Sequence, residues 1–96
     1  MKHAGPEALD GIDDLLVRLR RHAVLAERKR GCFYHKSAAF LHFHEDPEGM
    51  FADLKIDGDF RRFRVSTRAE QAAFLREVAR ALEPRAAPSR DTRRGG

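Results

Sequence analysis

The chain has 96 residues, of which 42% are hydrophobic and 35% are charged. This length supports one modest hydrophobic core and is too short for two. No apolar run approaches the roughly 20 residues of a membrane-spanning helix, and the N-terminal segment MKHAGPEALDG has no apolar signal core. The single cysteine, Cys32, excludes an internal disulfide. We therefore expect a cytoplasmic domain.

The net charge of +4 is concentrated at the C-terminus. Residues 84–96 hold four arginines against Asp91 alone, which gives +3 and leaves +1 for the other 83 residues. We predict a single compact domain over residues 1–83 and a disordered basic tail over 84–96, because the tail has no periodic apolar pattern. A high isoelectric point is then weak evidence for a nucleic-acid partner.

Residues 7–29 show the spacing of an amphipathic helix. Apolar side chains recur at steps of three or four residues, at Leu9, Ile12, Leu16, Leu19 and Ala23. Basic residues follow at 28–30, where they favour the negative end of a helix, and Gly31 is a plausible C-terminal stop. The pattern predicts one long helix.

Four short strands are predicted next, separated by turn signals. They are CFYH (32–35), AAFLHFH (38–44), MFADLKI (50–56) and DFRRFRV (59–65). The turns are Lys36-Ser37, the segment EDPEG, and Asp57-Gly58, which is a strong hairpin signal.

A second helix follows the strands. Thr67 and Glu70 have the spacing of a capping box, and Pro84 ends the element. The predicted fold class is therefore α+β, with a two-layer α-β-β-β-β-α order. We expect an antiparallel meander sheet with both helices on one face.

Strand alternation separates an inner face from an outer face. If His44 lies opposite Phe51, then Leu41 meets Leu54 and faces the core. The outer face then carries three rows: His42–Asp53–Arg62, His44–Phe51–Arg64 and Phe40–Lys55–Phe60.

Grouped aromatic and charged side chains on one sheet face are typical of an interface. The candidate binding face consists of Phe40, His42, His44, Phe51, Asp53, Phe60, Arg62 and Arg64. The main functional hypothesis is a non-enzymatic interaction module that forms a homodimer or binds a partner protein through this face, with aromatic anchors.

A metal site is an alternative interpretation of the same face. His42 and His44 point to one side of a strand, and Asp53 lies across the ladder, so the three side chains could bind zinc. Such a site would make the chain a metal-binding protein or a metal-dependent hydrolase. The simpler reading is a hydrogen-bonded pair between His42 and Asp53. The sequence offers no convincing nucleophile, so no catalytic residue is assigned and an enzyme is not expected.

Nucleic-acid binding is a further alternative. An antiparallel sheet that presents aromatic and basic residues can stack the bases of single-stranded nucleic acid or RNA and hold phosphates. Arg62 and Arg64 would supply positive charge, but acidic residues surround the same hairpins.

The segment GCFYHKSAAFLHFHEDPEGMFADLKIDGDF resembles a group of small bacterial proteins of unknown function. The shared features are a G-x-F-Y-x-K-S turn, an F-L-H-F-H-E-D strand end and an A-D-L-K strand. The resemblance implies the α-β-α order and no particular activity.

Overall fold

The structure, a computed structural model, describes residues 1–83. The predicted basic tail, residues 84–96, lies outside the described residues. The elements follow one another as β1 (Lys2–His3), α1 (Pro6–Gly11), α2 (Asp13–Leu19), β2 (Leu25–Lys29), β3 (Cys32–His35), β4 (Ala38–Asp46), β5 (Gly49–Ile56), β6 (Asp59–Arg64) and α3 (Arg68–Leu82). Within residues 1–83, no helix is long and apolar enough to cross a membrane.

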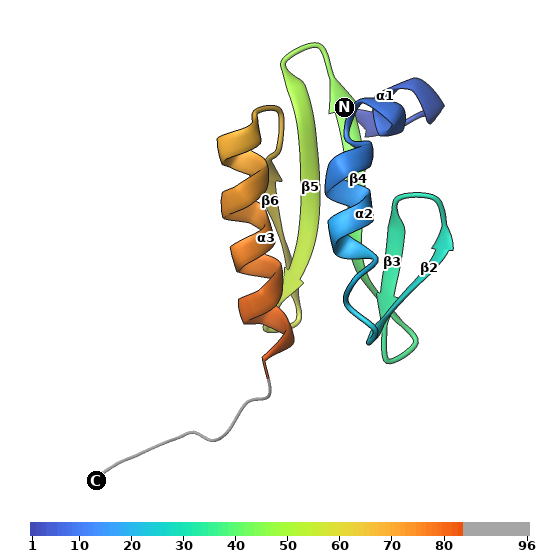
Figure 1. The fold of residues 1–96 in the computed structure, drawn as a ribbon, viewed down its shortest axis with the longest axis vertical. Helices are drawn as coiled ribbons and strands as arrows, with labels where there is room; N and C mark the ends of the chain where they lie inside the picture. The colour runs from blue at the N-terminus through green and yellow to red at the C-terminus, as the bar shows by residue number, and fades with distance from the viewer. Residues whose placement is uncertain (84–96) are drawn as a thin grey trace, which may run out of the picture.

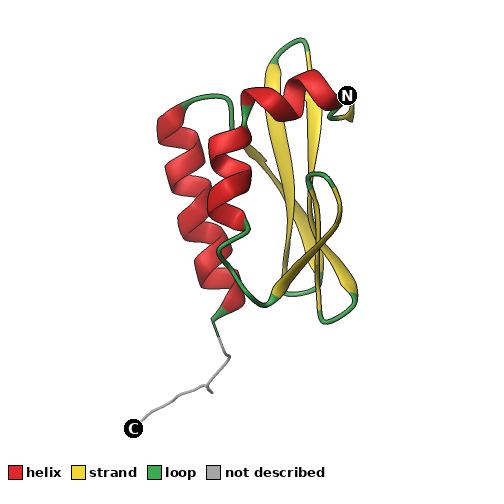
Figure 2. Cartoon of the chain, turned by 45° about the vertical axis from the view of Figure 1, so that its right-hand side comes forward, coloured by secondary structure: helices red, strands yellow, loops and turns green. Residues whose placement is uncertain are grey.

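The strands form one antiparallel sheet that is covered by helices on one face. Neighbouring strands follow the order β2-β3-β4-β5-β6, and the short β1 pairs with β4. Helices α2 and α3 lie side by side in one layer and the sheet forms the other (Figure 1, Figure 2). The predicted two-layer α+β meander is confirmed, and β1 and β2 are additional to the predicted strands. The outer face of the sheet is the side away from α2 and α3.

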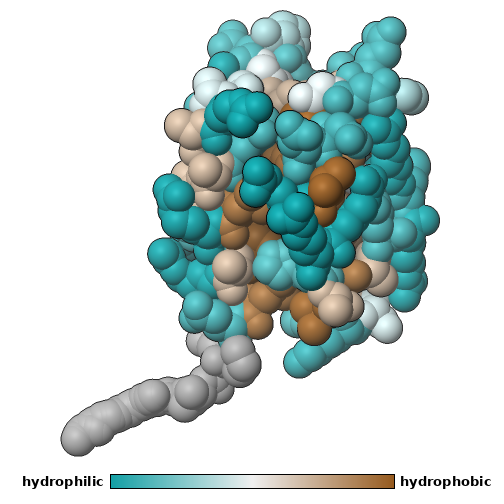
Figure 3. Space-filling model, in the orientation of Figure 1, coloured by the Kyte–Doolittle hydropathy of each residue, from teal (hydrophilic) through white to brown (hydrophobic). Residues whose placement is uncertain are grey.

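The hydrophobic core lies between the helices and the inner face of the sheet. Its fully buried large side chains are Leu15, Leu16, Leu19, Phe33, Leu41, Leu54, Val65, Phe74 and Val78. Figure 3 views the molecule from the helix side, where hydrophilic side chains dominate and hydrophobic atoms reach the surface between α2 and α3. The apolar stripes of the helices are therefore directed inward, as amphipathic helices require.

The register of the central strands is the one predicted. Leu41 lies opposite Leu54 on the buried side. The two complete outer rows are His42–Asp53–Arg62 and His44–Phe51–Arg64. Because side chains alternate, this register directs both histidines away from the core.

Two-residue turns connect β3 to β4 and β5 to β6, on either side of the central pair. Lys36, Ser37, Asp57 and Gly58 have φ angles of 53°, 69°, 52° and 88°. Positive φ at both central residues is the type I′ conformation, whose twist matches that of the flanking strands. The turns predicted at these two positions are confirmed.

Helix α3 begins with the predicted capping box. The Glu70 backbone N–H donates to the Thr67 hydroxyl at 3.1 Å, and the Thr67 N–H donates to the Glu70 carboxylate at 3.0 Å. Two backbone donors that have no partner inside the helix are thereby satisfied.

The single helix predicted over residues 7–29 is wrong beyond Leu19. Ile12 separates α1 from α2, with φ −118° and ψ 27°. After α2 the chain turns back, and Leu25–Lys29 pair with β3 as strand β2. Gly31 does not end a helix but lies in the β2–β3 turn with a φ of +80°.

The carboxylate of Glu27 shows what stabilises this hairpin. The Arg20 Nε donates to Glu27 Oε1 at 2.6 Å, and the Gly31 N–H donates to Oε2 at 2.9 Å. One side chain thus links the end of α2 to the β2–β3 turn. The hydrogen bond from Arg20 lowers the pKa of Glu27, even though partial burial opposes this.

Phe40, which was predicted on the outer face, is buried, with 5% of its surface exposed. Phe33 lies opposite Leu41 whereas Tyr34 lies opposite Ala39, so Phe40 is an extra residue in β4. Such a bulge bends and twists the strand locally, and Phe40 joins the core cluster. Strict alternation cannot anticipate a bulge, and the prediction that Phe40 is exposed is therefore wrong.

Substitution of Glu27 by Gln tests the link between α2 and the hairpin. We expect the free energy of unfolding at pH 7 to fall by about 1 kcal/mol, because the charge-assisted hydrogen bonds are weakened. The folded-state pKa of Glu27 is lowered, so its stabilisation is present above about pH 4.5 and is lost as the pH falls through the folded pKa. Urea denaturation at pH 7 and at about pH 3 should show a difference that shrinks in acid.

Glu77→Gln is the matched control for this prediction. Among residues 1–83, Glu77 makes only a helix-surface ion pair, with Arg80 at 3.5 Å, so its loss should change stability little. Equal effects of the two substitutions at both pH values would contradict the role assigned to Glu27.

Candidate metal centre on the outer sheet face

The outer face brings together most of the residues predicted for it. Asp53, in β5, is buried with 8% of its surface exposed, and His42 and His44, in β4, are partly buried. Arg62 and Arg64 on β6 are exposed. One carboxylate and two imidazoles are therefore less exposed than the two arginines, which lie beside them.

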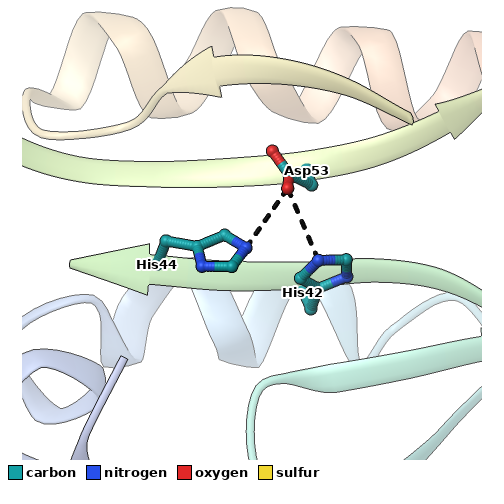
Figure 4. A group of neighbouring side chains, drawn as sticks. All are labelled: His42, His44 and Asp53. Carbon is teal, nitrogen blue, oxygen red and sulfur yellow. Dashed lines mark ion pairs between the residues drawn. The ribbon is translucent and has the colours of Figure 1, made fainter. Parts of the chain in front are cut away.

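Three ligand atoms converge at the centre of this face. Asp53 Oδ2 lies 3.2 Å from His44 Nε2 and 3.5 Å from His42 Nε2. One nitrogen or oxygen atom from each of the three residues lies within 4.8 Å of the others. Figure 4 shows both imidazoles reaching from β4 toward the same carboxylate oxygen on β5. We call His42, His44 and Asp53 the triad.

His44 Nε2 has an unusual environment. It is inaccessible to solvent and has no hydrogen-bond partner among the described residues. The 3.2 Å distance to Asp53 Oδ2 permits a charge interaction, but the geometry does not meet the angular requirements of a hydrogen bond. A buried polar atom of this kind calls for a specific explanation, and a bound ion is one.

Arg62 holds the carboxylate of Asp53 in place. Its Nε donates to Oδ1 at 2.8 Å and its Nη2 donates to Oδ2 at 2.9 Å, a bidentate pair. Burial raises the pKa of Asp53, but the hydrogen bonds and charge of Arg62, with contributions from both histidines, outweigh it and lower the pKa overall. Asp53 is therefore ionised at neutral pH.

His42 is held in its neutral form at neutral pH. Burial lowers its pKa, and the opposing charge of Asp53 does not compensate, while His44, His3 and Arg62 lower it further. A neutral imidazole has a free lone pair and is the form that binds metals.

A third imidazole, which sequence reasoning missed, lies beside the triad. His3 in β1 pairs with His44, and its ring stacks on the His44 ring at a centroid distance of 4.8 Å. A two-residue strand has no alternation pattern, so no sequence signal predicted this contact.

The aromatic residues of the face are partly covered. The Arg64 guanidinium lies over the Phe51 ring at 5.8 Å. Phe60 is 43% exposed and lies between Lys55, at 5.3 Å, and the His42 ring, at 5.1 Å. Since Phe40 is in the core, Phe60 is the most exposed aromatic of the predicted binding face.

Comparison with known proteins adds no relationship, because no family model, curated protein or solved structure matches this chain.

Asp53→Asn should destabilise the metal-free protein. The change keeps the shape of the side chain but removes the charge that pairs with Arg62, so we expect a loss of about 1–3 kcal/mol in the free energy of unfolding. Denaturation in the presence of a chelator measures it. Asp59→Asn, an exposed change near the same hairpin, should have little effect. Equal losses of stability for both variants would show that the pair between Asp53 and Arg62 does not stabilise the fold.

Proposed function

We propose that the chain binds one divalent transition-metal ion of the zinc class through the triad. The observation that carries the proposal is the distance from Asp53 Oδ2 to a nitrogen of each imidazole. Donor atoms around a tetrahedral zinc ion, with bonds of about 2.0–2.1 Å, are roughly 3.3 Å apart. The two distances from Asp53 Oδ2, 3.2 and 3.5 Å, bracket that value.

The ligand chemistry supports the same class of ion. Imidazole nitrogen suits zinc, copper, iron and nickel, whereas calcium and magnesium prefer oxygen ligands. Two imidazoles and one carboxylate form a set found in zinc sites that keep a fourth position available. A metal between them would also give His44 Nε2 the partner it lacks.

Arg62 limits how tightly the ion is held. A carboxylate offers about four lone-pair positions, and Arg62 occupies one on each oxygen, so Oδ2 retains one for a metal. Hydrogen bonds to a ligating carboxylate orient it for the metal. The arginine charge, however, offsets that of Asp53, so the site has little net negative charge and we expect an exchangeable ion.

Zinc titration of the metal-free protein tests the proposal. We expect one zinc ion per chain, and a loss of affinity greater than about 100-fold in the variant that combines His42→Ala and His44→Ala, since removing a ligand costs more than removing a supporting group. Calorimetry and elemental analysis after gel filtration measure both quantities.

His22→Ala is the matched control because His22, in the loop after α2, is not part of the triad. It should bind zinc as the wild type does. Absence of stoichiometric zinc in the wild type, or unchanged affinity in the double variant, would overturn the proposal.

A protein contact through the outer face is the second candidate function, and the exposure of Phe60 favours it. An apolar ring that is 43% exposed and flanked by cationic side chains fits the anchor of an interface. The contact would join two copies of the chain or one copy and a partner protein in the cytosol. Nucleic-acid binding stays a prediction with less support, because Arg62 and Arg64 are paired with Asp53 and Glu70.

Phe60→Ser tests the protein contact. If two copies associate through this face, sedimentation equilibrium of the wild type should show a concentration-dependent dimer that the substitution weakens. Val24→Ser, an exposed apolar change outside the outer face, is the control. A wild-type monomer at high concentration would exclude the homodimer.

A further inference from the structure

The N-terminal segment is attached to the strand that carries the histidines. Lys2 and His3 pair with Glu45 and His44. The backbone N–H of Ala4 donates to the carbonyl of Phe43 at 3.1 Å. These contacts place the segment along β4, next to the triad.

One ion pair and one hydrogen bond anchor the two ends of this segment. The N-terminal amine of Met1 lies 3.5 Å from Asp46 Oδ1. The Gly5 N–H donates to Glu45 Oε2 at 2.7 Å. The backbone of residues 1–5 is therefore held against β4 at Met1 and at Gly5, and His3 lies between these two contacts.

His3 shares the outer face with the triad. Residues directly opposite each other in an antiparallel pair project to the same side, so His3 and His44 are neighbours on this face. Its ring centroid lies 4.8 Å from that of His44 and 6.0 Å from that of His42, and those two rings are 5.0 Å apart. Imidazoles that share a tetrahedral zinc ion have centroids roughly 5 Å apart. Two of the three separations are close to this value, and the third, between His3 and His42, is about 1 Å longer.

We propose that His3 is the fourth ligand of the metal centre, and that metal binding and docking of the N-terminal segment stabilise each other. This inference rests on the proposed triad site. The His3 ring now lies near-parallel to the His44 ring, with an interplanar angle of 28°, so it must turn about its side-chain bonds to direct a nitrogen at the ion. His3 is exposed, which leaves room for that rotation.

The coupling follows from thermodynamic linkage. If the ion binds more tightly when His3 is docked, then the ion must favour the docked segment by the same factor. Strand β1 has only two residues and both are exposed, so its docking equilibrium is open to such a shift.

The test compares His3→Ala with Lys2→Ala in protein that carries no added N-terminal tag, because a tag would remove the Met1 amine from Asp46. Zinc affinity should fall about 100-fold or more in His3→Ala, because removing a ligand costs more than removing a supporting group, and stay near the wild-type value in Lys2→Ala. Zinc should also slow hydrogen exchange at the Ala4 amide in the wild type but not in His3→Ala.

A cobalt spectrum separates direct ligation from a covering role. His3→Cys in a Cys32→Ser background should give a thiolate-to-cobalt charge-transfer band, which appears only if residue 3 binds the ion. The Cys32→Ser protein alone should lack that band. Wild-type zinc affinity in His3→Ala together with no charge-transfer band in His3→Cys would overturn the role of His3 and leave the triad standing. Failure of the wild type to bind zinc would overturn both.

Discussion

The pairing of β4 with β5 is the constraint on which the rest of this structure depends. With Leu41 opposite Leu54 and Phe43 opposite Ala52, these four side chains enter the core, and the residues between them face outward. His42 and Asp53 are opposite each other for the same reason. A shift of one residue would bury the imidazoles and expose the leucines, so the stability of the core and the geometry of the triad are determined by one register.

The buried carboxylate of Asp53 is the electrostatic centre of the outer face. Burial of an ionised group is costly unless it is paired, and Arg62 pairs with both oxygens. The imidazoles of His42 and His44 approach the same carboxylate from β4, on the face of the sheet that is turned away from the core. A face that is only solvated has no need of a buried carboxylate beside two histidines, and this arrangement is the basis of the proposed metal-binding role of the triad.

Local signals predicted much of the fold correctly. The turn at Asp57-Gly58 depends on two neighbouring residues, and the capping box at Thr67 depends on residues three positions apart. The helix predicted over residues 7–29 failed because β2 is stabilised by pairing with β3 and by Glu27, whose partners lie four and seven residues away in a different geometry. The helical periodicity of a single segment carries no information about those contacts.

The sequence by itself determined the α+β class, the central register and the position of His42, His44, Asp53 and Arg62 on one face, because a period of two and strong turn residues are local properties. Only the tertiary structure decided that Phe40 enters the core through a bulge and that the N-terminal strand places His3 beside His44. Both results come from contacts between strands, and the second joins residues 41 positions apart. Such contacts depend on how distant segments pack against each other, and this packing is not recorded in any repeating pattern of the sequence.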